Sequence, residues 1–212
     1  MKKALIAVSG LACALALALT ACHKKSSTTS SSSVPIAGLA ADLAGGGNEL
    51  CQAVLAVDSG AISNCNGNSC QSGSVSYGSF SNNGSSANQN PVTINGSITE
   101  TFSGCALQQG GSTTTLTLNG TVDITFSNAS FNFSPPTDFN STNWTSLAIT
   151  GSESLSASGL SVTPQGASSA TSCSVGESVN LNQTVLANHG QGTNSSTYTG
   201  TSGCVAGQSG TE

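Results

Sequence analysis

Val92–Ser103 (VTINGSITETFS) and Leu116–Ser127 (LTLNGTVDITFS) repeat one pattern, and Leu147–Leu155 (LAITGSESL) is a degraded third copy. The Asn-Gly pair inside the first two copies normally indicates a tight hairpin turn. A two-residue hairpin in the second copy would set Leu118 opposite Thr121. Each face of the sheet would then mix apolar and polar side chains, so the hairpin interpretation is rejected.

A continuous strand keeps one face apolar. In the second copy that face carries Leu116, Leu118, Val122, Ile124 and Phe126, and in the first copy it carries Ile94, Ile98 and Phe102. The register that keeps one face apolar is the favoured one. Each strand then has a glycine at mid-length on its inner face, where a glycine often marks a bulge, a bend or a close backbone approach. The repeats therefore predict long, strongly bent strands.

The rest of the body repeats the period-two pattern between Gly, Asn and Pro residues. Further strands are predicted near Gly73–Phe80, Val175–Leu186 and Ser196–Gly203, and Asn128–Trp144 reads as a strand end followed by a loop. A short N-terminal helix is predicted to start at Glu49, capped by Asn48, with Leu50, Val54, Leu55 and Val57 on its apolar side. The predicted fold is mainly β: a single strongly curved, mostly antiparallel sheet of about six strands, with one short helix and disulfide staples.

The chain begins as an export signal. Met1-Lys2-Lys3 supplies a positive start, and Ala4–Leu19 is apolar or small throughout. This apolar stretch is shorter than the roughly 20 residues that span a bilayer. Residues 1–21 are therefore interpreted as a signal peptide that is removed.

Leu19-Thr20-Ala21-Cys22 resembles the lipobox of bacterial lipoproteins at all four positions. The resemblance implies cleavage before Cys22, a diacylglyceryl group on its thiol and acylation of the new amino terminus. Two or three acyl chains make a stable membrane anchor. In the enteric sorting scheme, Asp after the lipidated cysteine retains a lipoprotein in the inner membrane, so His23 favours the outer membrane.

The predicted organisation has three parts: the signal peptide 1–21, a lipidated Ser/Thr-rich tether 22–33 and a single β-rich domain 34–212. The tether composition is typical of a flexible linker. The last part has the size of one domain.

Charge is unusually scarce, because only 6% of the residues are charged against roughly 25% in ordinary soluble domains. The basic residues Lys2, Lys3, Lys24 and Lys25 all precede Val34, whereas all nine acidic residues follow it. Nucleic-acid binding rests on basic contacts to phosphate, so nucleic acid is excluded as a partner class. The same argument disfavours nucleotides, phosphorylated sugars and phosphate headgroups.

Six cysteines remain after Cys13 leaves with the signal and Cys22 is lipidated: Cys51, Cys65, Cys70, Cys105, Cys173 and Cys204. An even number in an exported chain predicts disulfides, here three with 15 alternative pairings. Zinc is the rival interpretation. It is disfavoured because no second close cysteine pair or nearby histidine completes a tetrahedral set with Cys65 and Cys70.

No catalytic constellation is recognisable. The Gly-x-Ser-x-Gly pattern is absent, and after the tether His189 is the sole histidine, in an Asn188–Gly192 segment that reads as a loop. A hydrolase would depend on His189 beside a serine and a carboxylate. The chain is therefore expected not to be an enzyme.

Glu100, Glu153 and Glu177 have the same strand parity as their apolar neighbours. A buried carboxylate with no basic partner becomes protonated, binds a cation or sits where water reaches it. One interpretation places them near strand ends, on an open face or beside a bulge that flips parity. The other is a cation site, calcium included, or a polar-ligand site on the concave face, with carboxylates within about 8 Å of one another.

Three functions remain open. The leading one is a non-enzymatic envelope lipoprotein in surface structure, adhesion or interaction with another envelope component. The second is a module that binds a small ligand or cation on the concave face, with Phe102 and Phe126 lining a cavity there. The third is the hydrolase that would use His189.

Overall fold

A computed structural model describes residues 36–44, 70–82, 90–108, 115–136, 145–186 and 192–211. These residues form one short helix and a nine-stranded sheet whose paired strands are all antiparallel. The elements are α2 (Leu39–Ala44), β1 (Ser74–Tyr77), β2 (Ser81–Asn82), β3 (Val92–Gln108), β4 (Thr115–Ser134), β5 (Ser146–Pro164), β6 (Thr171–Leu186), β7 (Thr193–Asn194), β8 (Thr197–Gly203) and β9 (Ser209–Thr211).

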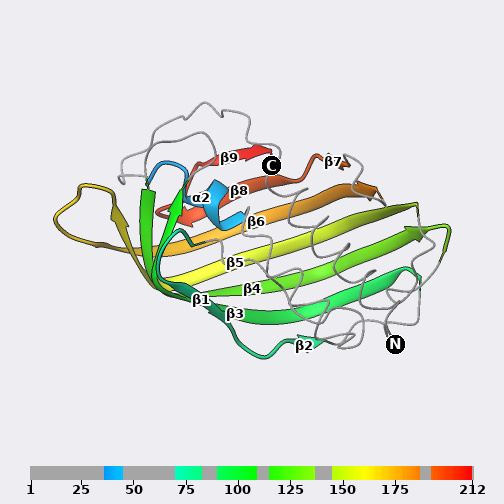
Figure 1. The fold of residues 1–212 in the computed structure, drawn as a ribbon, viewed down its shortest axis with the longest axis horizontal. Helices are drawn as coiled ribbons and strands as arrows, with labels where there is room; N and C mark the ends of the chain where they lie inside the picture. The colour runs from blue at the N-terminus through cyan, green and yellow to red at the C-terminus, as the bar shows by residue number, and fades with distance from the viewer. Residues whose placement is uncertain are drawn as a thin grey trace.

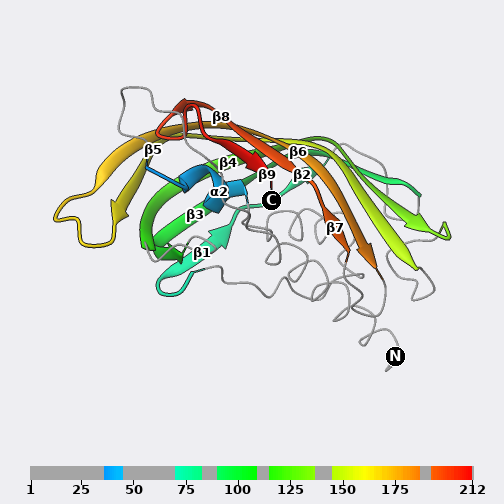
Figure 2. The same cartoon turned by 90° about the horizontal axis from the view of Figure 1, so that it is seen from above.

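The sheet order is β1-β3-β4-β5-β6-β8-β9, with β2 also paired to β3 and β7 to β6 (Figure 1). Strands β3 to β6 follow one another in the chain and in the sheet, so the centre is a simple meander of four long strands. Figure 2 shows these strands arched in one direction, with α2 inside the arch. The predicted class, a curved antiparallel sheet with one short helix, is confirmed.

The two repeats are continuous strands, as parity predicted. The first lies wholly in β3 and the second wholly in β4, and they pair with each other, so that Ile98 is opposite Ile124. Neither Asn-Gly pair makes a turn. The degraded third copy lies in β5, next to β4.

Each Asn-Gly pair instead accompanies a bulge in the partner strand. Asn95 Oδ1 accepts a hydrogen bond from the backbone N–H of Asn128, and Asn119 Oδ1 accepts one from the N–H of Gly104, both at 2.7 Å. Asn128 and Gly104 both have positive φ, 52° and 58°. The β3–β4 register shifts at both places. The two repeats therefore share one feature. In each, an asparagine side chain completes the β3–β4 hydrogen-bond ladder where the partner strand has an extra residue.

The core lies on the concave face, where the alternating apolar side chains gather. Its largest fully buried members are Phe126, Phe131, Phe133, Leu39, Ile94, Leu116, Leu118, Ile124, Leu147, Ile149 and Leu155. Leu39 comes from α2, which also buries Ala40, Leu43 and Ala44. One helix face therefore packs onto the sheet, beside β8 and β9.

The Gln208 side chain fastens α2 to the sheet. Its Nε2 donates to the carbonyls of Ile36 and Cys204, and its Oε1 accepts from the N–H of Ala40. Gln208 is buried, so these bonds satisfy both ends of its amide where water has little access.

The observed helix is not the one that the sequence indicated. The predicted helix from Glu49 lies outside the described residues. Helix α2 is six residues of Ala, Leu and Asp, too short to show the repeated apolar spacing on which a sequence assignment depends.

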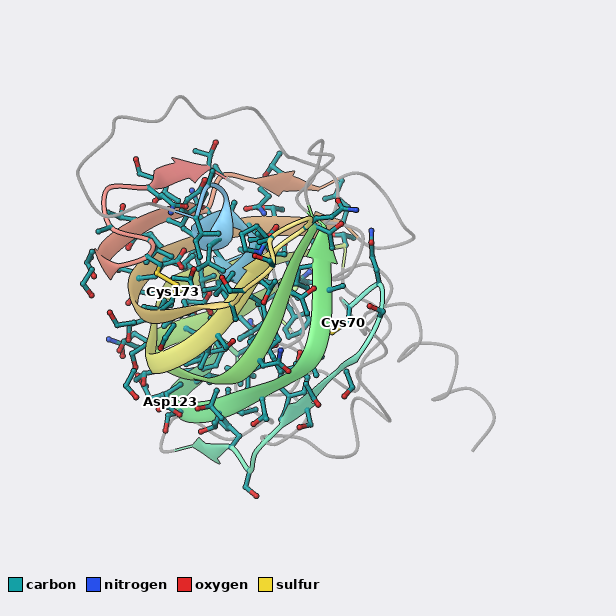
Figure 3. All side chains as sticks on the ribbon, turned by 90° about the vertical axis from the view of Figure 1, so that its left-hand side faces the viewer. Cys70, Asp123 and Cys173 are labelled. Carbon is teal, nitrogen blue, oxygen red and sulfur yellow. A yellow bond between two sulfur atoms is a disulfide. The ribbon has the colours of Figure 1, made fainter. Side chains whose placement is uncertain are left out.

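Two disulfides join described cysteines, Cys70 to Cys105 and Cys173 to Cys204. Figure 3 labels one cysteine of each bridge. The first ties the segment before β1 to β3, and the second ties β6 to the turn after β8, so the bridges fasten opposite sides of the sheet. Cys51 and Cys65 lie outside the described residues, so a third bridge stays a prediction.

We predict that Gly151→Ala destabilises the fold strongly. Gly151 has φ 130°, and an added Cβ would lie 2.5 Å from the carbonyl oxygen of Asn128. Backbone strain and a clash with backbone atoms together should cost more than about 2 kcal/mol in the free energy of unfolding. Urea unfolding of the full chain measures this cost.

The matched control is Gly159→Ala in the same strand, where an added Cβ meets nothing within 4 Å. This variant should change the free energy of unfolding by less than about 1 kcal/mol. Equal losses in the two variants would contradict the close approach of β4 and β5 at Gly151.

Candidate functional site

The concave face is the first candidate site, because polar side chains lie among its core residues. Glu100 on β3, Glu153 on β5 and Glu177 on β6 are 4%, 3% and 3% exposed. They are therefore buried with the apolar residues whose parity they share. The alternative that a bulge turns them outward does not hold for any of the three.

The register brings two of the three glutamates together. Glu153 is opposite Val179, and Glu177 is opposite Leu155. Glu153 and Glu177 are thus diagonal neighbours on adjacent strands, a spacing of roughly 7–8 Å that long side chains can bridge. Glu100 is on β3, three strands from β6, which separates it from Glu177 by about 14 Å of sheet.

A metal site that uses all three carboxylates finds no support in the described part of the chain. No group of three or more His, Cys, Asp or Glu side chains there is placed to hold a metal ion. Side-chain alternation along each strand fixes the face on which a residue lies, but it does not fix the distance between strands. Phe102 and Phe126, the predicted lining of a ligand cavity, are core residues; ligand binding on this face stays a prediction.

Two further polar residues belong to this face. Gln183 on β6, 2% exposed, is paired in register with Asn194 on β7. Gln183 Oε1 and Asn194 Nδ2 are both buried without a hydrogen-bond partner. Gln183 lies six residues after Glu177 in β6, so the same alternation places both side chains on the concave face. The burial of Gln183 could therefore have been predicted from the sequence.

Asp42 is a partly buried residue on the inner side of the arch that the sequence did not point to. It lies in α2, and its backbone N–H donates to the Gly38 carbonyl. Its Oδ2 is buried without a hydrogen-bond partner. Burial raises the pKa of Asp42 from the ordinary 3.8 to about 7, because desolvation penalises the charged form.

The convex face has the opposite chemistry. One row crosses six strands in register and consists only of hydroxyl residues: Ser97, Thr125, Ser154, Ser178, Thr199 and Ser209. All of them except the partly buried Ser178 are exposed. Asp123, labelled in Figure 3, is an exposed carboxylate in the next row, where it accepts a hydrogen bond from the Thr99 hydroxyl at 2.7 Å. The convex face is therefore a broad, nearly neutral array of hydroxyl groups.

Several predicted functional residues lie outside the described part of the chain. These are the lipidation residue Cys22, the hydrolase candidate His189 and the cysteines Cys51 and Cys65. Their predicted roles stay predictions. Within the described residues, no helix has the length and apolar character needed to cross a bilayer.

Comparison with known proteins gives no relative. No protein-family model, no curated protein and no solved structure matches this chain.

We predict that the Glu153 position tolerates a neutral side chain of the same shape but not a cation. The Glu153 side chain is 3% exposed and shares the inner face of β5 with the buried Ile149 and Leu155. Glu153→Gln, which keeps the shape of a neutral carboxyl group, should change the free energy of unfolding at pH 7 by no more than about 1 kcal/mol. Glu153→Lys should cost more than about 3 kcal/mol, because it buries a charge.

The control for Glu153 is Ser154→Lys, which adds the same charge one residue away on the convex face. Ser154 is exposed, so its substitution should cost less than about 0.5 kcal/mol. A loss of several kcal/mol in Glu153→Gln would contradict the prediction and indicate an ionised, paired carboxylate.

We predict that Asp42 makes the fold less stable as pH rises from 4 to 8. The pKa of Asp42 is raised to about 7 from 3.8, so between these values the folded state holds a proton that the unfolded state releases. The contribution of Asp42 is therefore complete below pH 4 and lost as pH rises toward 7. Asp42→Asn should remove this loss and be more stable than the wild type at pH 8, by up to about 4 kcal/mol.

Urea unfolding at pH 4, 6 and 8 tests the Asp42 prediction. The difference between wild type and Asp42→Asn isolates this carboxyl from the other acids. The same difference at all three pH values would contradict it.

Proposed function

We propose that this protein is a bacterial envelope lipoprotein, cut before Cys22 and anchored by lipid on that cysteine, with a non-enzymatic role in surface structure, adhesion or interaction. The tether 22–33 separates the anchor from the β domain. Because His23, and not Asp, follows the lipidated cysteine, we place the protein at the outer membrane.

The observation that carries the interaction role is the composition of the convex face. One row of hydroxyl side chains crosses six strands, and the hydrogen-bonded sheet supports it. Such a surface offers many weak, neutral contacts over a large area. This suits contact with another envelope component better than reaction at one centre. The lipobox resemblance at Leu19–Cys22 supports the anchor.

Cell fractionation with mass analysis tests the anchor. In cells that express the full sequence, the mature protein should appear in the membrane fraction. It should start at Cys22, and its mass should exceed that of the sequence from Cys22 onward by the attached acyl groups. Cys22→Ala should lose both the acyl mass and the cleavage at residue 22. Cys13→Ala, inside the predicted signal peptide, is the matched control and should behave as the wild type. A Cys22→Ala chain that is cut and anchored like the wild type would refute the proposal.

A second candidate function is ligand binding on the concave face. The observation that favours it is the burial of two diagonal carboxyl groups, Glu153 and Glu177, on that face. Native mass spectrometry of the full chain in detergent would show a retained small molecule. If the wild type retains a small molecule and the double variant Glu153→Gln/Glu177→Gln does not, this candidate is favoured. A wild-type chain that carries no small molecule would count against it.

A further inference from the structure

A groove of about 460 Å³ lies near one end of the sheet. Its lining among the described residues consists mainly of Gln71, Ala106, Thr115, Thr117, Thr163 and Gln165. Thr115, Thr117 and Thr163 alternate with the buried Leu116, Leu118 and Val162, so they face the convex side. The groove is therefore separate from the concave face and from the glutamates discussed above.

The fold builds this groove from three adjacent strands. Ala106 on β3 is opposite Thr117 on β4, and Thr117 is opposite Thr163 on β5. Ala106 is the smallest side chain in this row. At one side, the N–H of Gln71 donates to the Ala106 carbonyl at 2.8 Å, and at the other the N–H of Gln165 donates to the Thr115 carbonyl at 2.8 Å. Gln71 and Gln165 thus flank the groove, and its floor is formed by Thr115, Thr117 and Thr163.

The disulfide next to the groove makes this frame rigid. Cys70 immediately precedes Gln71, and Cys105 immediately precedes Ala106, and the two cysteines are bonded to each other. The floor belongs to the β3–β4–β5 ladder. A ligand would therefore meet a preformed surface, which lowers the ordering cost of binding.

The lining is neutral and rich in groups that both donate and accept hydrogen bonds. The described residues of the lining include no Asp, Glu, His, Lys or Arg. Among the described residues, the hydroxyls of Thr115, Thr117 and Thr163 make no hydrogen bond to protein. Hydroxyl and carboxamide groups are complementary to ligand hydroxyls, because each side can act as donor or acceptor.

We propose that this groove binds a neutral saccharide of one or two rings, with Thr117 and Thr163 hydrogen-bonding to its hydroxyls. Its volume lies within the range of small-ligand sites, about 300–1,000 Å³. The site goes beyond the proposed anchoring and interaction role and does not depend on it.

Other ligand classes fit the groove less well. An anion would find no cation in the lining, and none follows Lys25 in the sequence. An extended peptide usually binds by adding a strand to a sheet edge. Here the floor is a sheet face whose backbone groups are already paired in the β3–β4–β5 ladder.

The test is isothermal titration of the full chain in a detergent that contains no sugar. The probes are maltose, cellobiose, lactose and diacetylchitobiose. At least one should bind the wild type with a Kd in the millimolar range or below. Because no charged group lines the groove, the Kd should be the same at low and high salt.

The variants Thr117→Val and Thr163→Val remove one hydroxyl each and keep the side-chain shape. Together they should raise the Kd of the bound saccharide at least about tenfold. Thr125→Val, a hydroxyl removal elsewhere on the convex face, should leave the Kd within about twofold. Circular dichroism confirms that each variant is folded.

Three results would overturn the inference. The first is that none of the four saccharides binds below about 20 mM, too weak for a built site. The second is a saccharide that binds the double Val variant as well as the wild type. The third is binding of an uncharged Ser/Gly peptide with no saccharide binding, which would assign the groove to protein ligands. Each of these results leaves the anchor at Cys22 untouched, so the two proposals fail independently.

Discussion

The fold depends on keeping one face of four long, bent strands apolar along their whole length. Strands of 16 to 20 residues cannot stay flat in a sheet this curved. Bulges take up the mismatch, and each extra residue reverses the side-chain alternation beyond it. The apolar pattern changes parity at the same places, from Phe126 to Ala129 in β4 and from Phe102 to Cys105 in β3, so the inner face stays apolar on both sides of each bulge. Asn95 and Asn119 hold the bulges by accepting hydrogen bonds from the N–H groups of Asn128 and Gly104.

That alternation also places glutamates and hydroxyl side chains on opposite faces, in a chain that has no Lys or Arg after Lys25. Glu100, Glu153 and Glu177 lie inside among aliphatic residues, and hydroxyl groups lie outside. Hydroxyl side chains keep the outer surface hydrated with little charge, and they leave it able to make neutral hydrogen bonds. The two faces therefore differ in chemistry as well as in polarity, which is why the interaction role and the saccharide groove are both proposed on the convex face.

Parity in the sequence was sufficient to predict the long strands, the rejection of the Asn-Gly hairpins and the face on which the glutamates lie, but not the two- and three-residue strands β2, β7 and β9. These features depend on residues close together in the chain. It could not predict that Glu100 is three strands from Glu177, because strand order depends on pairing between distant segments. The groove could not be predicted from the sequence either, because it exists only where Ala106, Thr117 and Thr163 come into register on three strands. Helix α2 and the clamp of Gln208, 168 residues from Ala40, depend on tertiary packing.

Hydrogen exchange at the Gly104 and Asn128 amides tests the central claim most directly. Both protons should be protected to the same degree as the neighbouring ladder amides, since each is bonded to an asparagine side chain. Asn119→Ala should release Gly104 alone, and Asn95→Ala should release Asn128 alone. Rapid exchange of both amides in the wild type would contradict the account, because it would mean that the bulges do not hold the strands in register.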